Sequence, residues 1–376
     1  MRDVVEIGLG KSAQRGYHLD EVAIVPSRRT RDVDDVSTAW QLDAYPFKIP
    51  CVAHPSDATM SPTTAALLGR LGGLGTLNVE GLWCRYEDPT KLLDSIASLD
   101  EIDNVGATRR LQELYAEPIK PELIGERIRS IRDGGEAVAV RVSPQHTLAL
   151  APVILDAGVD ILVIQGTIVS AEHVSTQEEP LNLKEFIADL DLPVVVGGCT
   201  DYKTALHLMR TGAAGVIVGV GADSWSTTDT VLGIRVPMAT AIADAAAARR
   251  DYLDETGGRY VHLIADGDIV TSGDIAKALG CGADAVMLGE PLARCAEAPA
   301  GGAWWHSSAS HPKLPRGFFG GAEEPLGPLE QVLYGPSDDA DGTMNLFGGL
   351  RRAMAKCGYR DLKEFQKVSL VLDRNA

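Results

Sequence analysis

Short apolar runs alternate with helix-like segments along most of the 376-residue chain. The runs are bounded by glycine, proline or polar residues, as buried parallel strands are. Alternation of strands and helices implies an α/β fold with a parallel sheet. The count of eight strands favours a (β/α)8 TIM barrel over an open doubly wound sheet. We expect this barrel to form a single domain over residues 1–376. The expected strands cover residues 49–53, 74–77, 137–142, 161–165, 193–198, 214–219, 260–267 and 283–289.

The segments between these runs carry apolar residues at helical spacing. Gly158, Gly212 and Gly282 each follow such a segment and stand just before the next strand, where glycine supplies the left-handed turn that ends a helix. This repeated junction indicates that the strand–helix units are equivalent. The expected helices cover residues 63–71, 147–156, 183–190, 201–210, 236–255, 274–279, 351–359 and 361–368.

Two segments interrupt the alternation. Residues 84–133 are charged but keep a helical spacing of leucine and isoleucine, which predicts two or three surface helices inserted after the second strand. Residues 296–346 are rich in glycine and proline and follow the last strand. A long irregular segment of this kind is typical of a functional flap, and a surface for a partner is the alternative.

Charge and cysteine content narrow the function classes. The net charge is −17, from 35 basic and 52 acidic residues, so we expect neither nucleic acid nor a membrane surface as a partner. The six cysteines are scattered, which argues against a disulfide framework and a zinc cluster. The chain shows no signal peptide and no apolar stretch of membrane-spanning length, so we expect a cytoplasmic protein.

Three loops at the carboxyl ends of strands are the candidates for chemistry, because ligands of α/β barrels bind there. The loop after the sixth strand carries the hydroxyl groups of Ser224, Ser226 and Thr228. The loops after the seventh and eighth strands, at residues 265–268 and 288–291, offer glycine for an approach of backbone N–H groups to a phosphate. Ordinary turn chemistry of aspartate and glycine is the alternative for these two loops.

Several motifs together are similar to a known family. They are Leu19-Asp20-Glu21-Val22, Pro55-x-Asp57, Gly72-Gly73-x-Gly75, the loop at residues 219–228, Ile264–Gly267 followed by Ser272–Leu279, and Gly348–Arg351 with Met354 and Cys357-Gly358. On these stretches, which extend through nearly the whole chain, the sequence resembles the IMP dehydrogenase/GMP reductase family. It is most similar to the short branch that lacks the regulatory pair of CBS domains, whose place residues 84–133 would occupy.

The resemblance implies a barrel that binds a purine nucleoside monophosphate together with NAD or NADP. In this family a loop cysteine attacks C2 of the purine and a hydride passes to or from the nicotinamide. The resemblance also implies a homotetramer or homo-octamer and a potassium ion near Gly221, Asp223 and Ser226. By position, the catalytic residues would be Ser226 and Thr228. The cofactor side would include Gln165, Gly219 and Gly221. The nucleotide would contact Ser224, Asp266, Gly267, Asp268, Gly289 and Glu290.

Five positions depart from the family pattern, and one of them is Asp223, which replaces a glycine expected to approach a cation or phosphate through its backbone. Ser226 stands where the family has its cysteine, and an alcohol is a much weaker nucleophile than a thiol. Asp268 and Glu290 stand where glycine and serine are usual, and Gln165 replaces an aspartate on the cofactor side. Two functions therefore stay open: interconversion of IMP with XMP or GMP, weak or lost, and a catalytically inert purine-binding or regulatory protein.

Overall fold

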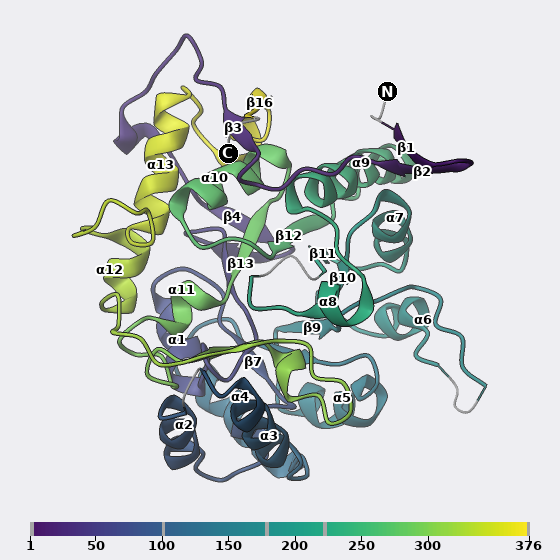
Figure 1. The fold of residues 1–376 in the computed structure, drawn as a ribbon, viewed down its shortest axis with the longest axis vertical. Helices are drawn as coiled ribbons and strands as arrows, with labels where there is room; N and C mark the ends of the chain where they lie inside the picture. The colour runs from purple at the N-terminus through teal and green to yellow at the C-terminus, as the bar shows by residue number, and fades with distance from the viewer. Residues whose placement is uncertain (1–3, 100–101, 177–179, 221–223, 374–376) are drawn as a thin grey trace.

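The computed structural model describes residues 4–99, 102–176, 180–220 and 224–373. Within these residues, eight parallel strands pair in the order β6-β13-β12-β11-β10-β9-β8-β7 and are surrounded by helices (Figure 1). A bridge between Val52 and Leu74 brings the two ends of the sheet together, so the barrel is nearly closed. The strands are β6 (Cys51–Ala53), β7 (Thr76–Asn78), β8 (Ala139–Val142), β9 (Ile161–Gln165), β10 (Val194–Cys199), β11 (Gly215–Val218), β12 (His262–Asp266) and β13 (Ala285–Leu288).

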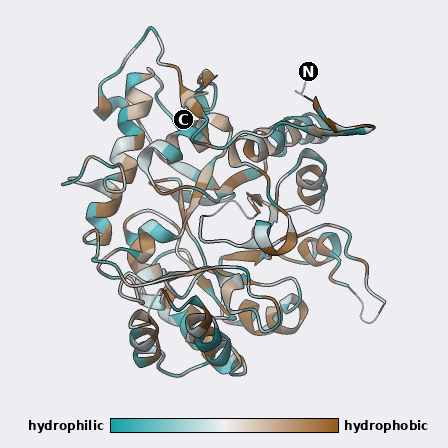
Figure 2. Ribbon diagram, in the orientation of Figure 1, coloured by the Kyte–Doolittle hydropathy of each residue, from teal (hydrophilic) through white to brown (hydrophobic). Residues whose placement is uncertain are grey.

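Each predicted barrel strand is present, so the TIM-barrel prediction is confirmed. Every residue of β9, β10 and β11 is buried. Strands covered on both faces are apolar throughout and do not alternate, which is why short apolar runs located them. Hydrophobic residues accordingly lie along the strands at the centre of the barrel (Figure 2).

Several of the outer helices begin where a polar side chain caps them. Asp201 caps α7, and Thr271 forms a capping box with Asp274, so α10 begins two residues before the helix expected there. Neighbouring helices pack against one another around the barrel, as α7 does on α9 and α9 does on α10. These helices are α1 (Pro62–Arg70), α5 (Thr147–Asp156), α6 (Leu183–Ala188), α7 (Tyr202–Arg210), α8 (Thr228–Leu232), α9 (Met238–Thr256), α10 (Ser272–Cys281) and α11 (Glu290–Ala293).

The helical segment after β7 divides into two parts. It contains η2 (Leu82–Cys84), α2 (Thr90–Ala97), α3 (Asn104–Tyr115) and α4 (Pro121–Arg132). Helix α4 packs between α1 and α5 and so belongs to the ring of barrel helices. Helices α2 and α3 are extra, and α3 contacts the flap segments. Figure 1 shows both at one edge of the barrel, beside the flap.

The segment after β13, which includes the flap, is held in place by a second apolar cluster. This segment contains β14 (Trp304–Trp305), η3 (Ser307–Ser310), β15 (Phe319–Gly320) and α12 (Leu329–Tyr334). The side chains of Trp304, Trp305 and Phe319 are buried with Leu111 and Leu114 of α3. The flap therefore rests on the inserted helices, and its packing joins segments far apart in the sequence. The closing helices are α13 (Leu346–Lys356) and α14 (Leu362–Phe365).

Small sheets outside the barrel complete the fold. Strand β3 (Val22–Ile24) pairs with β16 (Leu370–Leu372), and β4 (Trp40–Leu42) pairs with β5 (Tyr45–Phe47). A hairpin of β1 (Val4–Gly8) and β2 (Lys11–Gln14) projects from the body (Figure 1). The turn η1 (Val33–Asp35) precedes β4. No helix of the described residues is long and apolar enough to cross a membrane.

Candidate functional site

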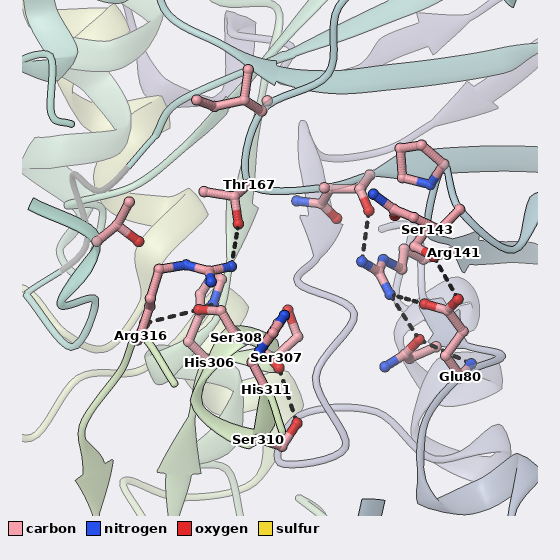
Figure 3. A pocket seen from close by; sticks show the side chains of 18 of the residues that line it. Glu80, Arg141, Ser143, Thr167, His306, Ser307, Ser308, Ser310, His311 and Arg316 are labelled. Atoms are coloured by element: carbon pink, nitrogen blue, oxygen red, sulfur yellow. Dashed lines mark hydrogen bonds and ion pairs between the residues drawn. The ribbon is translucent and has the colours of Figure 1, made fainter. Parts of the chain in front are cut away.

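A cavity of about 600 Å³ opens at the carboxyl end of the barrel strands. Its walls come from the ends of β7, β8, β9, β11 and β12 and from the flap (Figure 3). Five residues predicted from the sequence line it together: Gln165, Gly219, Ser226, Thr228 and Asp266. The catalytic and cofactor-side predictions within the described residues thus converge on one cavity.

The residues predicted for the phosphate line a separate, much smaller pocket. Its volume is about 30 Å³, against about 600 Å³ for the large cavity. Asp266 lines this pocket as well as the large cavity. The predicted nucleotide residues are therefore brought together, but around a pocket with little free space. The other predicted nucleotide residues that line it are Ser224, Gly267, Asp268, Gly289 and Glu290.

Two indole rings pack against residues that line this small pocket. Trp225 Nε1 donates a hydrogen bond to Glu290 Oε2 at 2.7 Å. The ring of Trp225 packs so closely on the flap that a Cβ atom on Gly320 would lie 2.8 Å from its Cη2 atom. In the same way, a Cβ atom on Gly289 would lie 2.4 Å from Cη2 of Trp304. The protein's own side chains thus contact two of the loop residues that were predicted to face a phosphate.

Asp268 adds a carboxylate beside the filled pocket. Its φ of 52° lies in the left-handed region, where glycine is common and aspartate is tolerated. Burial raises the pKa of Asp268, against the opposing charge of Arg235, whose Nη2 lies 3.6 Å from Oδ2. The position keeps the backbone conformation of a glycine while placing a carboxyl group close to the phosphate loops.

Ser226 is engaged with its own loop. Its Oγ donates to Thr228 Oγ1 at 2.9 Å and accepts from the backbone N–H of Thr228 at 3.3 Å. None of the described histidines or carboxylates hydrogen-bonds to Ser226 Oγ. A serine hydroxyl needs an adjacent base to become a nucleophile. The geometry supports a role for Ser226 in shaping the start of α8.

Gln165 and Gly219 contact Asp266 directly. Gln165 Nε2 donates to Asp266 Oδ2 at 2.9 Å, while Gln165 Oε1 is buried with no hydrogen-bond partner in the described part of the chain. Gly219 has a φ of 147°, and a Cβ atom there would lie 1.8 Å from the carbonyl oxygen of Asp266. Only glycine allows this approach of β11 to the end of β12.

A polar cluster that the sequence did not predict lies on the opposite wall. Glu80, after β7, accepts hydrogen bonds from Arg141 Nη1 at 2.6 Å, from Ser143 Oγ at 2.6 Å and from His146 Nδ1. Arg141 also donates to the carbonyl oxygen of Gln165 at 2.6 Å. Figure 3 shows Glu80, Arg141 and Ser143 turned toward one another. The one available signal was a charged residue, Arg141, inside an apolar strand.

Hydrogen bonds and charges within this cluster shift the pKa values of Glu80 and His146. Burial alone would raise the pKa of Glu80, but the hydrogen bonds from His146 and Ser143 and the charge of Arg141 outweigh it and bring the pKa to about 2. The hydrogen bond to Glu80 in turn raises the pKa of His146. Glu80 is therefore a carboxylate throughout the physiological range.

The flap supplies the wall that faces this cluster. Arg316 Nη2 donates to Thr167 Oγ1 at 3.0 Å, and Arg316 Nη1 donates to the carbonyl oxygen of Leu314 at 3.1 Å. His306 is half-buried in this wall and its Nδ1 lies 2.7 Å from Ser308 Oγ. Burial, together with the charges of Arg141 and Arg316, lowers the pKa of His306 to about 4, so its ring is neutral.

Two of the three residues predicted to lie near a potassium ion, Gly221 and Asp223, lie outside the described residues. Ser226, the third residue, makes the contacts given above. In the described part of the chain, no group of three or more histidine, cysteine, aspartate or glutamate side chains could hold a metal ion. The potassium site remains a prediction.

Comparison with known proteins identifies the family. The sequence model of the IMP dehydrogenase/GMP reductase domain matches residues 16–318. An uncharacterized oxidoreductase of Mycolicibacterium smegmatis is 60% identical over 98% of this chain and all of its own length, and one from Mycobacterium tuberculosis is 62% identical with the same coverage. Inosine-5'-monophosphate dehydrogenase of Methanocaldococcus jannaschii is 26% identical over 94% of this chain and 92% of its own.

A solved structure agrees with the sequence comparison. The crystal structure of an IMP dehydrogenase/GMP reductase-like protein from Corynebacterium glutamicum superposes with a TM-score of 0.93 at 56% identity, covering 99% of this chain and 98% of the other. The fold, the loop motifs and these matches agree, and the chain belongs to the IMP dehydrogenase/GMP reductase family of oxidoreductases.

Proposed function

We propose that this protein binds a purine-related ligand or a nicotinamide dinucleotide in its large cavity but does not carry out the covalent chemistry of its family on a nucleoside monophosphate. The observation that carries the proposal is the state of Ser226, whose Oγ is bound to Thr228 with no described base in contact. Without a thiolate or an activated alcohol, no covalent purine adduct forms at a useful rate.

The filled phosphate pocket supports the same proposal. A nucleoside monophosphate brings a dianionic group, whereas this pocket is lined by Asp268 and Glu290. Each carboxylate would oppose the phosphate by on the order of a kcal/mol at partly buried range. Trp225 would also have to leave Glu290 before a phosphate could enter. We therefore expect weak binding of IMP and GMP.

A nicotinamide dinucleotide fits the large cavity. Its volume of about 600 Å³ lies in the range of small-molecule sites. Gln165 presents a buried Oε1 without a described partner, which could accept an amide N–H, and Arg316 could approach a phosphate. Such a cofactor would supply hydride transfer, and Gln165, Thr167 and Arg316 are the residues that would hold it.

A second candidate is the family activity itself, at a low level. The observation in its favour is the convergence of Ser226, Thr228, Gln165 and Asp266 in one cavity. The two candidates differ in whether nicotinamide is reduced or oxidised when the purine is added.

The deciding experiment measures turnover and binding on the same preparation. Nicotinamide absorbance is followed with IMP plus NAD and with GMP plus NADPH, beside a family member that keeps the loop cysteine. We expect no change above the protein-free background, with NAD, NADP and purine nucleosides tested for binding by calorimetry. Sustained turnover with either pair would overturn the proposal, and so would the failure of every one of these ligands to bind.

Ser226→Cys tests the reason for the inactivity. The variant restores a thiol but leaves Trp225 and Glu290 over the phosphate loops. We expect it to remain inactive with IMP. Full activity of this single variant would show that the phosphate pocket is functional and that only the nucleophile was lost.

A further inference from the structure

We propose that the large cavity recognises an anionic ligand, carrying a phosphate or carboxylate group and a separate O–H or N–H donor, through Arg316 on one wall and the Glu80–His146 pair on the other. This proposal names a ligand chemistry for the cavity of the proposed function, and it rests on that function only in assuming that the cavity binds a ligand. Figure 3 shows the two groups of side chains on opposite sides of the open space.

Arg316 is a cation held without a counter-ion. Its guanidinium donates to Thr167 Oγ1 and to a backbone carbonyl, and no carboxylate of the described residues forms an ion pair with it. Its Nε is a buried donor with no partner among the described residues. A partly buried guanidinium with a buried, unpaired Nε is stabilised when an anion accepts its N–H groups in a paired geometry.

The overall composition of the protein does not account for a positively charged wall in the cavity, because the net charge is −17. Arg85, which also lines the cavity, donates to the backbone carbonyl of Glu80 at 2.9 Å and to that of Glu117. Arg141 is already balanced by Glu80. The cavity therefore favours an anion near Arg316.

On the opposite wall, Glu80 determines which ring nitrogen of a neutral His146 carries the hydrogen. A carboxylate can only accept, so a neutral His146 must donate its Nδ1 hydrogen to Glu80. The lone pair then lies on Nε2, on the other side of a ring whose side chain is 55% exposed and lines the cavity. Ser143 Oγ and Arg141 hold Glu80 in place. A carboxylate–histidine pair of this kind accepts a proton or a hydrogen bond from a ligand.

The anion is tested with two probes that separate its sources: pyrophosphate for phosphate groups and citrate for carboxylates. Binding is measured by calorimetry and thermal shift on the full chain. We expect at least one probe to bind and Arg316→Gln to weaken it tenfold or more, with Arg316→Lys intermediate. Lys313→Gln, an exposed flap residue outside the cavity, should change nothing. Absence of binding to the unaltered protein, or equal binding by Arg316→Gln, would overturn the proposal.

The proton position is tested without a ligand. Nitrogen NMR of the histidine rings reports which nitrogen of neutral His146 carries hydrogen. We expect Nδ1–H, and a loss of this preference in Glu80→Gln, while His207→Asn serves to assign an unrelated exposed ring. An Nε2–H tautomer in the unaltered protein would refute the assignment. Turnover of IMP would contradict the proposed function but leave these two measurements unaffected, so the failures are distinguishable.

Discussion

Trp225 Nε1 donates a hydrogen bond to Oε2 of Glu290 at 2.7 Å, and this contact joins the loop after β11 to the first turn of α11. In a barrel of this family both segments are expected to face a phosphate. Here they bind each other, and the flap residue Gly320 closes over the same indole. Two segments predicted to face an external anion are thus joined by an internal hydrogen bond.

Opening that contact should restore space for a phosphate. In the double variant Trp225→Gly, Glu290→Ser the indole and one carboxylate are removed from the small pocket. We expect the affinity for IMP to rise at least tenfold, which corresponds to about 1.4 kcal/mol. Calorimetry checks this, with Glu290→Ser alone as the comparison. Unchanged IMP affinity in the double variant would mean that other residues exclude the nucleotide.

Gly219 should tolerate no side chain. In Gly219→Ala, the added methyl would clash with the carbonyl oxygen of Asp266, and the φ of 147° belongs to a region open essentially to glycine. We expect a loss of more than about 3 kcal/mol in the free energy of unfolding, or no folded protein. Gly233→Ala is the matched control, because its φ of 68° is left-handed but its surroundings are open. It should cost about 1 kcal/mol.

Asp57 should make stability fall as the pH rises from about 4 to about 6. Burial raises its pKa from 3.8 to about 6, against the hydrogen bonds from Tyr115 and the Leu82 N–H. Because the native state holds this proton more tightly than the unfolded chain, its contribution to the free energy of unfolding decreases by about 3 kcal/mol from pH 4 to pH 6 and is constant above.

Asp57→Asn removes this titration. We expect the difference in unfolding free energy between variant and unaltered protein to change over that pH interval, measured by urea denaturation. The exposed Asp94→Asn is the control and should show no such change. A pH-independent difference for Asp57→Asn would contradict the raised pKa.

Glu80 should have the opposite pH dependence. Its pKa is lowered from 4.5 to about 2, so the stability that it contributes is complete above pH 4.5 and is lost as the pH falls toward 2. Glu80→Gln should cost about 3 kcal/mol at neutral pH, since it also leaves Arg141 without its partner.

The measurement is again urea denaturation, now extended to acidic pH. Glu87→Gln, in an exposed position of the same segment, is expected to be neutral. A Glu80→Gln variant as stable as the unaltered protein at pH 7 would show that the cluster does not hold Glu80 as a stabilised carboxylate.

The barrel could be predicted from the sequence because its strands are buried on both faces. Runs such as Ile161–Gln165 carry that information locally, and the helix caps at Asp201 and Thr271 are equally local. The loop with Ser226 could be found for the same reason, since it follows directly on one strand.

The cluster on the other wall could not be predicted in this way. Glu80, Arg141 and His146 come from the ends of β7 and β8, which the inserted helices separate in the sequence and which only their pairing in the sheet brings together, and no short motif connects them. The packing of the indole rings against Gly289 and Glu290 could not be predicted either. It depends on where Trp225 and Trp304 point, and the flap that directs them is positioned by α3 rather than by its own sequence.

Tyr115 of α3 donates from its hydroxyl to Asp57 Oδ2 at 2.5 Å and accepts a hydrogen bond from Trp305 Nε1 at 3.1 Å. One phenol thus connects the barrel, the inserted helices and the flap. These parts should open together, so amide hydrogens of β14 and α3 should exchange with solvent at a common rate rather than in sequence. Entry of a large ligand would then be limited by a rare cooperative opening, and binding would be slow even where affinity is high.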